Sequence, residues 1–424
     1  MTAMADLEGL YSECREHLEK KFIPFWKWLC DYENGGFYGL VTGDLAAHKS
    51  AEKGCVLNSR ILWFFSMVYR RLHDEDSLDM ARHAYAFLRD RFIDRDNGGL
   101  YWSVTALGEP LEADKYCFCQ ASAVYALSAY AIAEHIDSSL AIRDDKYGEG
   151  RSKEALELAY TIADFMEEHL RDETGYIEAV TDDLLPTENI QLSYDGEASD
   201  RTISTAISVL EAYNELYKAG EKPEILERLK AAVSMFLDRF YDRENVRLFT
   251  AFDRDYNSMC ETYSYGHDLE ASWLIDDALA TIGDWDRAGE ASEMSGRLVA
   301  AVYDRALEQT DHSAAVPLQR LNGVVDETRM WWVEAEAVNG FLNAVYRATR
   351  LDDRQLSLQY AEAVGKLWNF IRSSMIDERS GGEWFCAVSA EGVHDTALPI
   401  ADIWKGPFHA GRMCLEVIHR LNTE

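Results

Sequence analysis

The sequence predicts an all-α protein: an (α/α)6 barrel of six helical hairpins, with short β-hairpins capping one end. Two observations predict this fold, namely an aspartate-containing phrase that recurs six times and twelve segments with apolar residues at helical spacing. No Pro/Gly/Ser-rich linker and no block of like charge divides the chain, so residues 1–424 are expected to form a single domain.

The recurring phrase places mostly apolar residues before an aspartate, and often polar residues and glycine after it. Successive aspartates lie roughly 60 to 80 residues apart, which leaves room for two helices in each unit. The uneven spacing favours equivalent units with loops of different length over a tight solenoid. The six aspartates are Asp31, Asp94, Asp172, Asp242, Asp304 and Asp377.

Apolar residues at i, i+3 and i+4 predict helices that fill these units. An open solenoid is the competing arrangement, and it is disfavoured because neither end of the chain carries a polar capping repeat. Short alternating pieces after three of the aspartates, at 35–39, 98–102 and 381–385, predict small hairpin strands. The predicted helices span 5–29, 56–73, 76–93, 116–136, 152–170, 202–218, 222–240, 267–282, 287–303, 329–348, 354–373 and 409–421.

Composition excludes several classes of partner. The net charge of −33 disfavours nucleic acid, whose phosphates need clustered Lys and Arg, and an uncharged small-molecule ligand fits better. The N-terminus has no apolar signal core and no later stretch reaches membrane-spanning length, so a cytoplasmic protein without a membrane partner is expected. Eight scattered cysteines are expected to be free thiols, and oligomeric state is not indicated.

Unusual residues gather at the starts of alternate helices. Alternate helices of such a barrel run parallel, so their N-termini are expected to open onto one mouth that holds the site. A single residue of this kind is more often a helix cap or a core residue, and the interpretation depends on the whole set. That set is Arg60, Tyr116, Gln120, Ser208, His267, Glu270, Trp331, Trp332, Trp404 and His409.

Two histidines in this set suit acid–base chemistry. A histidine in the first turn of a helix lies at the positive end of the helix dipole, which favours the neutral imidazole, and both His267 and His409 qualify. Glu270 follows His267 by one turn and is positioned to orient the imidazole or to accept a sugar hydroxyl. Arg60 either pairs with a carboxylate or binds a hydroxyl or an enediolate.

The tryptophans favour a sugar ligand. Core filling is the ordinary role of an isolated tryptophan, but here the aromatic residues accompany charged and amide groups. Aromatic faces stack on the C–H faces of sugars while polar groups bind the hydroxyls. Trp331, Trp332 and Trp404, together with Tyr116, Gln120 and Ser208, are therefore predicted to bind the substrate.

With these motifs the sequence resembles the N-acylglucosamine 2-epimerase superfamily, and most closely its cellobiose 2-epimerase branch. The resemblance covers nearly the whole chain. It implies an (α/α)6 barrel that removes and returns a proton at C2 of a reducing-end aldose without metal or other cofactor, giving a 2-epimer or a ketose, with His267 and His409 as the two bases. The motifs that carry it include Lys53-Gly-Cys-Val-Leu-Asn-Ser-Arg60, Ser264-Tyr-Gly-His-Asp-Leu-Glu-Ala-Ser-Trp273, Trp331-Trp-Val-Glu-Ala-Glu336 and Trp404-Lys-Gly-Pro-Phe-His409.

One departure from the branch concerns two further histidines. The branch carries Asn-Thr-His-Leu-His before Leu-Glu-Ala-Tyr, and alignment on Leu210 places Ala206 and Ser208 at the two histidine positions. The second of these histidines is associated in the branch with the anomeric end and ring opening, so poor activity on cellobiose is expected. A milder change puts Phe408 where the branch has tyrosine.

Two other functions compete with epimerisation. Several glycoside hydrolases share the barrel and use two carboxylates, for which Asp268, Glu336 and Asp402 are the candidates. The missing histidines also allow a sugar-binding relative without catalytic activity. Cleavage of a disaccharide would favour the first alternative, and glycan binding without proton exchange at C2 would favour the second.

Overall fold

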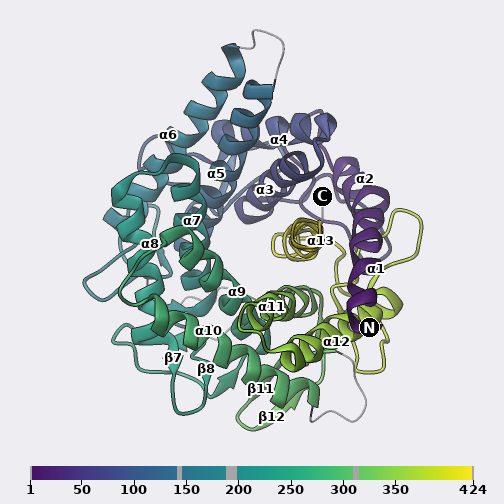
Figure 1. Cartoon of the computed structure of the whole chain (residues 1–424). Helices are drawn as coiled ribbons and strands as arrows, with labels where there is room; N and C mark the ends of the chain where they lie inside the picture. Colours follow the sequence, from purple (N-terminus) through teal and green to yellow (C-terminus); the bar gives the residue numbers. More distant parts are fainter. Residues whose placement is uncertain (1, 141–145, 188–197, 309–314, 423–424) are drawn as a thin grey trace.

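A computed structural model describes residues 2–140, 146–187, 198–308 and 315–422, and in them the predicted barrel is confirmed (Figure 1). Within the described chain, an inner ring of six helices surrounds the centre. Each helix contacts the next along the chain and the last contacts the first, so the ring is closed. The ring consists of α3 (Cys55–Leu72), α5 (Cys117–Leu140), α7 (Ile203–Gly220), α9 (Tyr265–Ile282), α11 (Trp331–Arg350) and α13 (Phe408–Leu421).

The intervening helices form an outer layer, which closes where α1 contacts α12. Every predicted helix is present, although the first is divided, because a π-helical turn joins α1 to α2. Similar π-helical turns extend four other outer helices towards the recurring aspartates. The outer layer comprises α1 (Thr2–His17), η1 (Leu18–Phe22), α2 (Ile23–Trp28), α4 (Glu75–Phe87), η2 (Leu88–Phe92), α6 (Lys146–His169), α8 (Pro223–Met235), η3 (Phe236–Phe240), α10 (Ala288–Val302), η4 (Tyr303–Glu308), α12 (Arg354–Phe370) and η5 (Ile371–Met375).

Short antiparallel strands link neighbouring units at one end of the barrel. A strand that directly precedes an inner helix pairs with a strand of the following unit, and a bridge between Val41 and Ala401 joins the last unit to the first. The strand pairings thus run around the whole ring. The pairs are β1 (Lys53–Gly54) with β2 (Ser103–Val104), β4 (Lys115–Tyr116) with β5 (Ala179–Val180), β6 (Arg201–Thr202) with β9 (Ala251–Phe252), β10 (Thr262–Tyr263) with β11 (Gln319–Leu321), and β13 (Arg329–Met330) with β14 (Ala387–Val388).

Three further strand pairings complete these sheets. β3 (Pro110–Glu112) pairs with β2, and β12 (Val324–Asp326) pairs with β11. β7 (Tyr241–Asp242) pairs with β8 (Arg247–Leu248) just after an outer helix. The predicted hairpins at 35–39, 98–102 and 381–385 are confirmed only as single bridges, for example between Ile93 and Leu100.

The recurring aspartates hold the hairpins against the next inner helix. Asp31 accepts hydrogen bonds from the backbone N–H groups of Glu33 and Asn34, and its other oxygen lies 2.7 Å from the Nζ of the buried Lys53. Lys53 stands two residues before α3. Burial without this pairing would be costly for both charges.

The same aspartate–cation pair recurs in the next two units. Lys115, two residues before α5, pairs with Asp94 at 3.0 Å, and Arg201, two residues before α7, pairs with Asp172 at 2.6 Å. The aspartates were recognised in the sequence as markers of the repeat, but their cationic partners were not. These pairs fix where each inner helix begins, and hence where the residues of its first turn lie.

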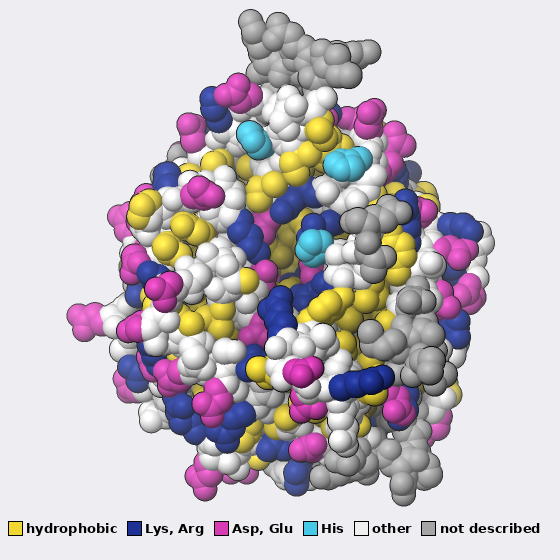
Figure 2. Space-filling view, in the orientation of Figure 1, with side chains coloured by type: hydrophobic (Ala, Val, Ile, Leu, Met, Phe, Trp, Pro, Cys, Tyr) yellow, Lys and Arg dark blue, Asp and Glu magenta, His cyan; other side chains and the backbone are white. Residues whose placement is uncertain are grey.

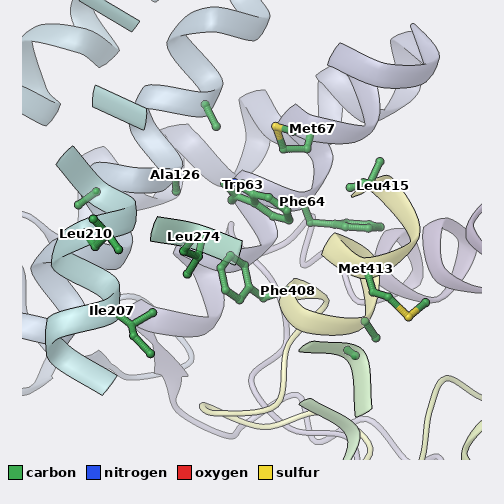
Figure 3. Close-up of a cluster of buried hydrophobic side chains, with 14 of the residues drawn as sticks. Trp63, Phe64, Met67, Ala126, Ile207, Leu210, Leu274, Phe408, Met413 and Leu415 are labelled. Atoms are coloured by element: carbon green, nitrogen blue, oxygen red, sulfur yellow. The ribbon is translucent and has the colours of Figure 1, made fainter. Parts of the chain in front are cut away.

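Buried apolar side chains fill the space between the inner helices (Figure 3). Trp63 of α3 and Phe408 of α13 meet edge to face with ring centroids 4.9 Å apart, and Leu210 and Leu274 reach the cluster from α7 and α9. Because interiors are close-packed, this cluster sets the distances between the inner helices and so the geometry of their first turns.

The surface shows mixed charge. Figure 2 shows acidic and basic side chains interleaved over the face seen in Figure 1, with a hollow near its centre. None of the described helices is both long enough and apolar enough to span a membrane.

Candidate active site

The first turns of the inner helices enclose one large cavity of about 640 Å³. This confirms the predicted mouth, because every inner helix contributes to it. Arg60 comes from α3 and Phe118 from α5. The remaining helices supply Ser204, Ser208 and Glu211 (α7), His267 and Glu270 (α9), Trp331 and Trp332 (α11), and Phe408 and His409 (α13), and Trp404 lies in the loop before α13.

His409 is held by a buried carboxylate. Its Nδ1 lies 2.8 Å from Oε1 of Glu336, whose Oε2 accepts a hydrogen bond from Nε1 of Trp273 at 2.9 Å. Burial lowers the pKa of His409 to about 3, and Glu336 offsets this only in part. Burial alone would raise the pKa of Glu336, but Arg412 and His409 outweigh burial and lower it. His409 is therefore neutral, with its proton on Nδ1 and the Nε2 lone pair available as a base.

His267 is held by two hydroxyl groups instead. Its Nδ1 lies 2.7 Å from Oγ of Ser264, and its Nε2 lies 3.2 Å from Oγ of Ser204. A hydroxyl can donate or accept a hydrogen bond, so this arrangement accommodates both the neutral and the protonated imidazole. These two contacts alone therefore do not fix one tautomer of His267.

Trp332 lies between the two histidines. Its ring centroid is 4.7 Å from that of His267 and 5.9 Å from that of His409. A Cβ atom on Gly266 would lie 2.5 Å from Cζ3 of Trp332, so only glycine admits the indole at this point. The Tyr-Gly-His phrase of α9 thus places both the His267 imidazole and the aromatic surface beside it.

Arg412 is the centre of the charge network, and it was not among the residues predicted from the sequence. Its buried guanidinium donates hydrogen bonds to Glu211 and Glu270, and to Oε1 of Glu336 at 2.7 Å. Arg412 follows His409 by three residues on α13, and that spacing is the signal that would have found it. By spacing alone, Glu270, Glu336 and His409 resemble a metal-binding group, but the guanidinium already donates to Oε1 of both glutamates, and His409 is bound to Glu336.

Arg60 faces the cavity from α3. Its Nη1 donates to the backbone carbonyl of Trp404 at 3.0 Å, and its guanidinium lies over the ring of Phe408 at 4.8 Å. Burial lowers the pKa of Arg60 to about 10, so the group stays charged at neutral pH. Among the described residues no carboxylate lies within ion-pair distance of it, which favours the second of its two predicted roles, binding a substrate oxygen.

Gln120 does not reach the cavity, which corrects the prediction that it binds substrate. Its buried side chain accepts a hydrogen bond from the N–H of Leu100 at 2.8 Å and donates to the carbonyl of the same residue at 2.9 Å. Asp268 and Glu334, which are likewise the fourth residues of their helices, accept from the N–H groups of Leu248 and Val316. This position holds a preceding hairpin onto the inner helix.

Tyr116 also lies outside the cavity lining, which corrects its prediction as a substrate contact. Its ring centroid is 4.5 Å from that of Trp102, which in turn lies 5.2 Å from that of Trp404. Tyr116 supports the aromatic wall from behind. Trp331, Trp332 and Trp404 line the cavity, as predicted.

Only one of the two positions that lack histidine faces the cavity. Ser208 lines it, one turn before Glu211 on α7. Ala206 is buried, does not line it, and is the fourth residue of α7, the same position that Gln120 occupies in α5. The departure at Ser208 therefore alters the lining of the cavity, whereas that at Ala206 alters a buried position outside it.

The carboxylates nominated for hydrolysis do not form an acid–base pair. Asp268 and Glu336 are buried outside the cavity lining. Asp402 lines the cavity, but its Oδ1 accepts hydrogen bonds from the N–H groups of Trp404 and Lys405 at 2.8 and 2.6 Å. A retaining or inverting hydrolase needs two carboxylates that flank the scissile bond, so this alternative is not favoured.

Two imidazoles on one tryptophan surface, in a barrel whose cavity is lined with aromatic residues and the Arg60 guanidinium, fit a sugar isomerase. Residues 35–406 match the model of the N-acylglucosamine 2-epimerase (GlcNAc 2-epimerase) family, and the chain belongs to that family.

Relatives of known activity match along the full length. The chain is 39% identical to the cellobiose 2-epimerase of Dictyoglomus turgidum, over 98% of this chain and 100% of the relative. The crystal structure of a sugar epimerase from a ruminal bacterium is 37% identical and superposes with a TM-score of 0.88, covering 98% of this chain and 100% of that one. A D-mannose isomerase, 19% identical with a TM-score of 0.77 over 97% of this chain and 98% of its own, shares the fold. The protein is a sugar 2-epimerase.

Proposed function

We propose that His409 and His267 together exchange the proton on C2 of an uncharged reducing-end aldose, without a metal or other cofactor. The single observation that supports this most is the placement of both imidazoles beside Trp332 at one cavity. Epimerisation removes a proton from one face of the sugar and returns it to the other, so it needs two acid–base groups.

In the proposed reaction, His409 accepts the C2 proton at Nε2, because its Nδ1 proton is committed to Glu336. The enediolate that results is stabilised by the Arg60 guanidinium at the cavity wall. His267 then delivers a proton to the opposite face of C2, and the reverse direction exchanges the roles of the two histidines. Delivery to C1 instead of C2 yields a ketose.

The charges around the cavity support an uncharged substrate. Lys405 lines the cavity, but its ammonium group is buried and bound to Glu383 and to the carbonyl of Ile400. Among the described residues that line the cavity, Arg60 is then the cation left for the sugar, and a phosphate would also meet Glu211, Glu270 and Asp402. The tryptophans offer the flat apolar surfaces on which a neutral sugar ring stacks.

Space beside Ser208 supports an aldose other than cellobiose as the best substrate. Serine is much smaller than the histidine of the branch, so a bulkier group at C1 or C2, or a differently placed sugar, fits there. A cytoplasmic location stays a prediction from the sequence.

Proton NMR in D₂O tests the proposal directly. The purified protein is incubated with glucose, mannose, N-acetylglucosamine, cellobiose and mannobiose in the presence of a chelator. We expect deuterium to enter C2 of at least one of them, accompanied by its epimer or ketose. Cleavage of a disaccharide, or binding of a sugar without exchange at C2, would instead establish one of the two competing functions.

A further inference from the structure

Ionising all three glutamates around Arg412 would be energetically costly. Glu211, Glu270 and Glu336 are all buried, and they share one guanidinium. Arg60 is the other nearby cation, so a fully ionised cluster would carry one uncompensated negative charge in the interior. Burying an unpaired charge is expensive, and a carboxyl group escapes the cost by holding a proton.

The hydrogen-bond donors decide which glutamate holds that proton. Glu336 accepts from Nδ1 of His409, from Arg412 and from Nε1 of Trp273, which occupies both of its oxygens and fixes it as the anion. Glu211 accepts from Nη1 of Arg412, which it does not share with the other two glutamates.

Glu270 has the weakest set of hydrogen-bond donors of the three glutamates. Its Oε1 must share Nη2 of Arg412 with Oε1 of Glu336, and the two carboxylates come within 4.8 Å of each other. Two carboxylates that share a site in this way do not both ionise readily. Oε2 of Glu270 has no hydrogen-bond partner among the described residues, and Glu270 lines the cavity.

We propose that Glu270 is a neutral carboxylic acid at neutral pH, and that its Oε2–H donates a hydrogen bond to an acceptor oxygen of the bound sugar, namely the C1 carbonyl of the open-chain form. The role towards the sugar depends on the proposed function, whereas the protonation state does not. Glu270 is then a donor, in contrast to the acceptor that the sequence suggested.

Titration behaviour agrees with this geometry. Burial raises the pKa of Glu270 well above its usual range, Glu336 and Glu211 raise it further, and Arg412 lowers it in part. The charged and titratable groups near the carboxyl are Arg60 of α3, Glu211 of α7, His267 of α9, Glu336 of α11, and His409 and Arg412 of α13.

The neutral donor has a consequence for catalysis. A carboxylic acid polarises the carbonyl and then stabilises the enediolate oxygen as its negative charge grows. An anionic Glu270 would repel the same oxygen. Activity is therefore expected to fall at alkaline pH as Glu270 loses its proton.

Infrared difference spectroscopy without substrate tests the protonation state. The spectrum of the wild-type protein minus that of Glu270→Gln at neutral pH should contain the carbonyl stretch of a protonated carboxyl group, shifted in D₂O. The matched spectrum for Glu362→Gln, at an exposed pair with Lys366, should contain carboxylate bands instead. Acids outside the Arg412 cluster contribute equally to both proteins and cancel. Carboxylate bands alone in the Glu270 difference spectrum would overturn the proposal.

Kinetics test the donor role separately. The amide of the Glu270→Gln variant still donates a hydrogen bond, so kcat/KM of this variant at neutral pH should fall on the order of tenfold or less. The fall of its activity at alkaline pH, which is the alkaline limb of the pH–rate profile, should disappear. In the wild-type protein that limb should coincide with the pH at which the infrared carboxyl band is lost. A loss on the order of 10²-fold or more with the alkaline limb unchanged would refute donation. If no sugar reacts, the infrared result still decides the protonation state, so the two failures are distinguishable.

Discussion

Oε1 of Glu336 and Nδ1 of His409 lie 2.8 Å apart, and this contact leaves Nε2 as the nitrogen of His409 that can act as the base in the proposed reaction. Glu336→Gln removes the anion that keeps the proton on Nδ1, and the neutral amide accepts either tautomer. We expect kcat to fall by roughly 10²–10⁴, comparable with removing an acid–base group, while the fold is kept. Steady-state kinetics with circular dichroism measure both, and full activity in this variant would remove Glu336 from the mechanism.

The two-histidine mechanism predicts that proton exchange and epimerisation can be separated. With His409→Ala, His267 can still remove the C2 proton that points towards it, and the reverse holds for His267→Ala. In D₂O each variant should therefore exchange the C2 proton of only one epimer of the substrate, and the two variants should exchange opposite epimers.

Conversion between epimers should fall in both variants by roughly 10²–10⁴. Proton NMR of each separate epimer reads both quantities in one experiment. Unimpaired epimerisation by either variant would show that a single group serves both faces of the sugar.

Gly266 is expected to control activity through Trp332. The added methyl group of Gly266→Ala would lie 2.5 Å from Cζ3 of Trp332 and 2.9 Å from Cγ2 of Val333. The indole must then move, and with it the surface shared by the two histidines, at a cost of about 1–3 kcal/mol in stability. We expect kcat/KM to fall by roughly tenfold or more.

Gly289 of α10 offers a matched control. A Cβ atom there would meet nothing within 4 Å, and the residue lies in an outer helix. Gly289→Ala should leave kcat/KM unchanged and keep or slightly raise the melting temperature. Equal kinetic effects of the two variants would show that Trp332 tolerates displacement.

Much of the fold could be predicted because helical periodicity and the aspartate phrases are local signals. All predicted helices are present, and the mouth formed by alternate helix starts contains His267, Glu270 and His409. The pattern could not tell which side of an inner helix a residue of its first turn faces. Gln120 was mistaken for a ligand-binding residue for this reason.

Residues that act through long-range pairing were harder to find. Arg412 and Glu211 meet across 201 residues of sequence, and Glu336 reaches His409 across 73. The local spacing of Arg412 from His409 could have drawn attention to Arg412, but no local pattern shows which distant residue either Arg412 or His409 meets. They come together only because the ring closes and brings α7, α11 and α13 around one centre.

Stability should depend on pH through buried acids that hold the hairpins onto the inner helices. Burial raises the pKa of Glu334 to about 8, while the N–H of Val316 and the charge of Arg329 lower it only in part. Because the folded state holds the proton more tightly than the unfolded chain, Glu334 stabilises the fold fully below its ordinary pKa, and this contribution is lost as the pH rises through about 8.

Glu334→Gln should therefore weaken the decline in the free energy of unfolding between about pH 4.5 and about pH 8, by about 1.4 kcal/mol for each pH unit that separates the folded-state pKa from the unfolded-state pKa. Urea denaturation at a series of pH values measures this change in the pH dependence.

Part of the decline should remain in the Glu334→Gln variant, because burial also raises the pKa values of Glu178 and Asp268 to about 7. Glu362→Gln, at an exposed pair with Lys366, is the control and should change nothing. A pH profile of Glu334→Gln that matches the wild type would mean that Glu334 is already ionised.

The last prediction concerns Ser208, where the cellobiose 2-epimerase branch has a histidine associated with the anomeric end. Ser208 lines the cavity on the same face of α7 as Ser204 and Glu211, so an imidazole at this position would reach the cavity. If the absence of this imidazole limits cellobiose turnover, Ser208→His should raise kcat/KM for cellobiose relative to the best aldose of the wild-type protein.

Ala206→His is the matched control, because Ala206 is buried outside the cavity lining, and an imidazole there should destabilise the fold without any gain on cellobiose. The ratio of kcat/KM values for the two sugars, measured for all three proteins, separates an effect on specificity from a general loss of activity. Cellobiose as the best substrate of the wild-type protein would show that another group attends the anomeric oxygen, and Ser204, which lies 3.2 Å from Nε2 of His267, would then be the first residue to test.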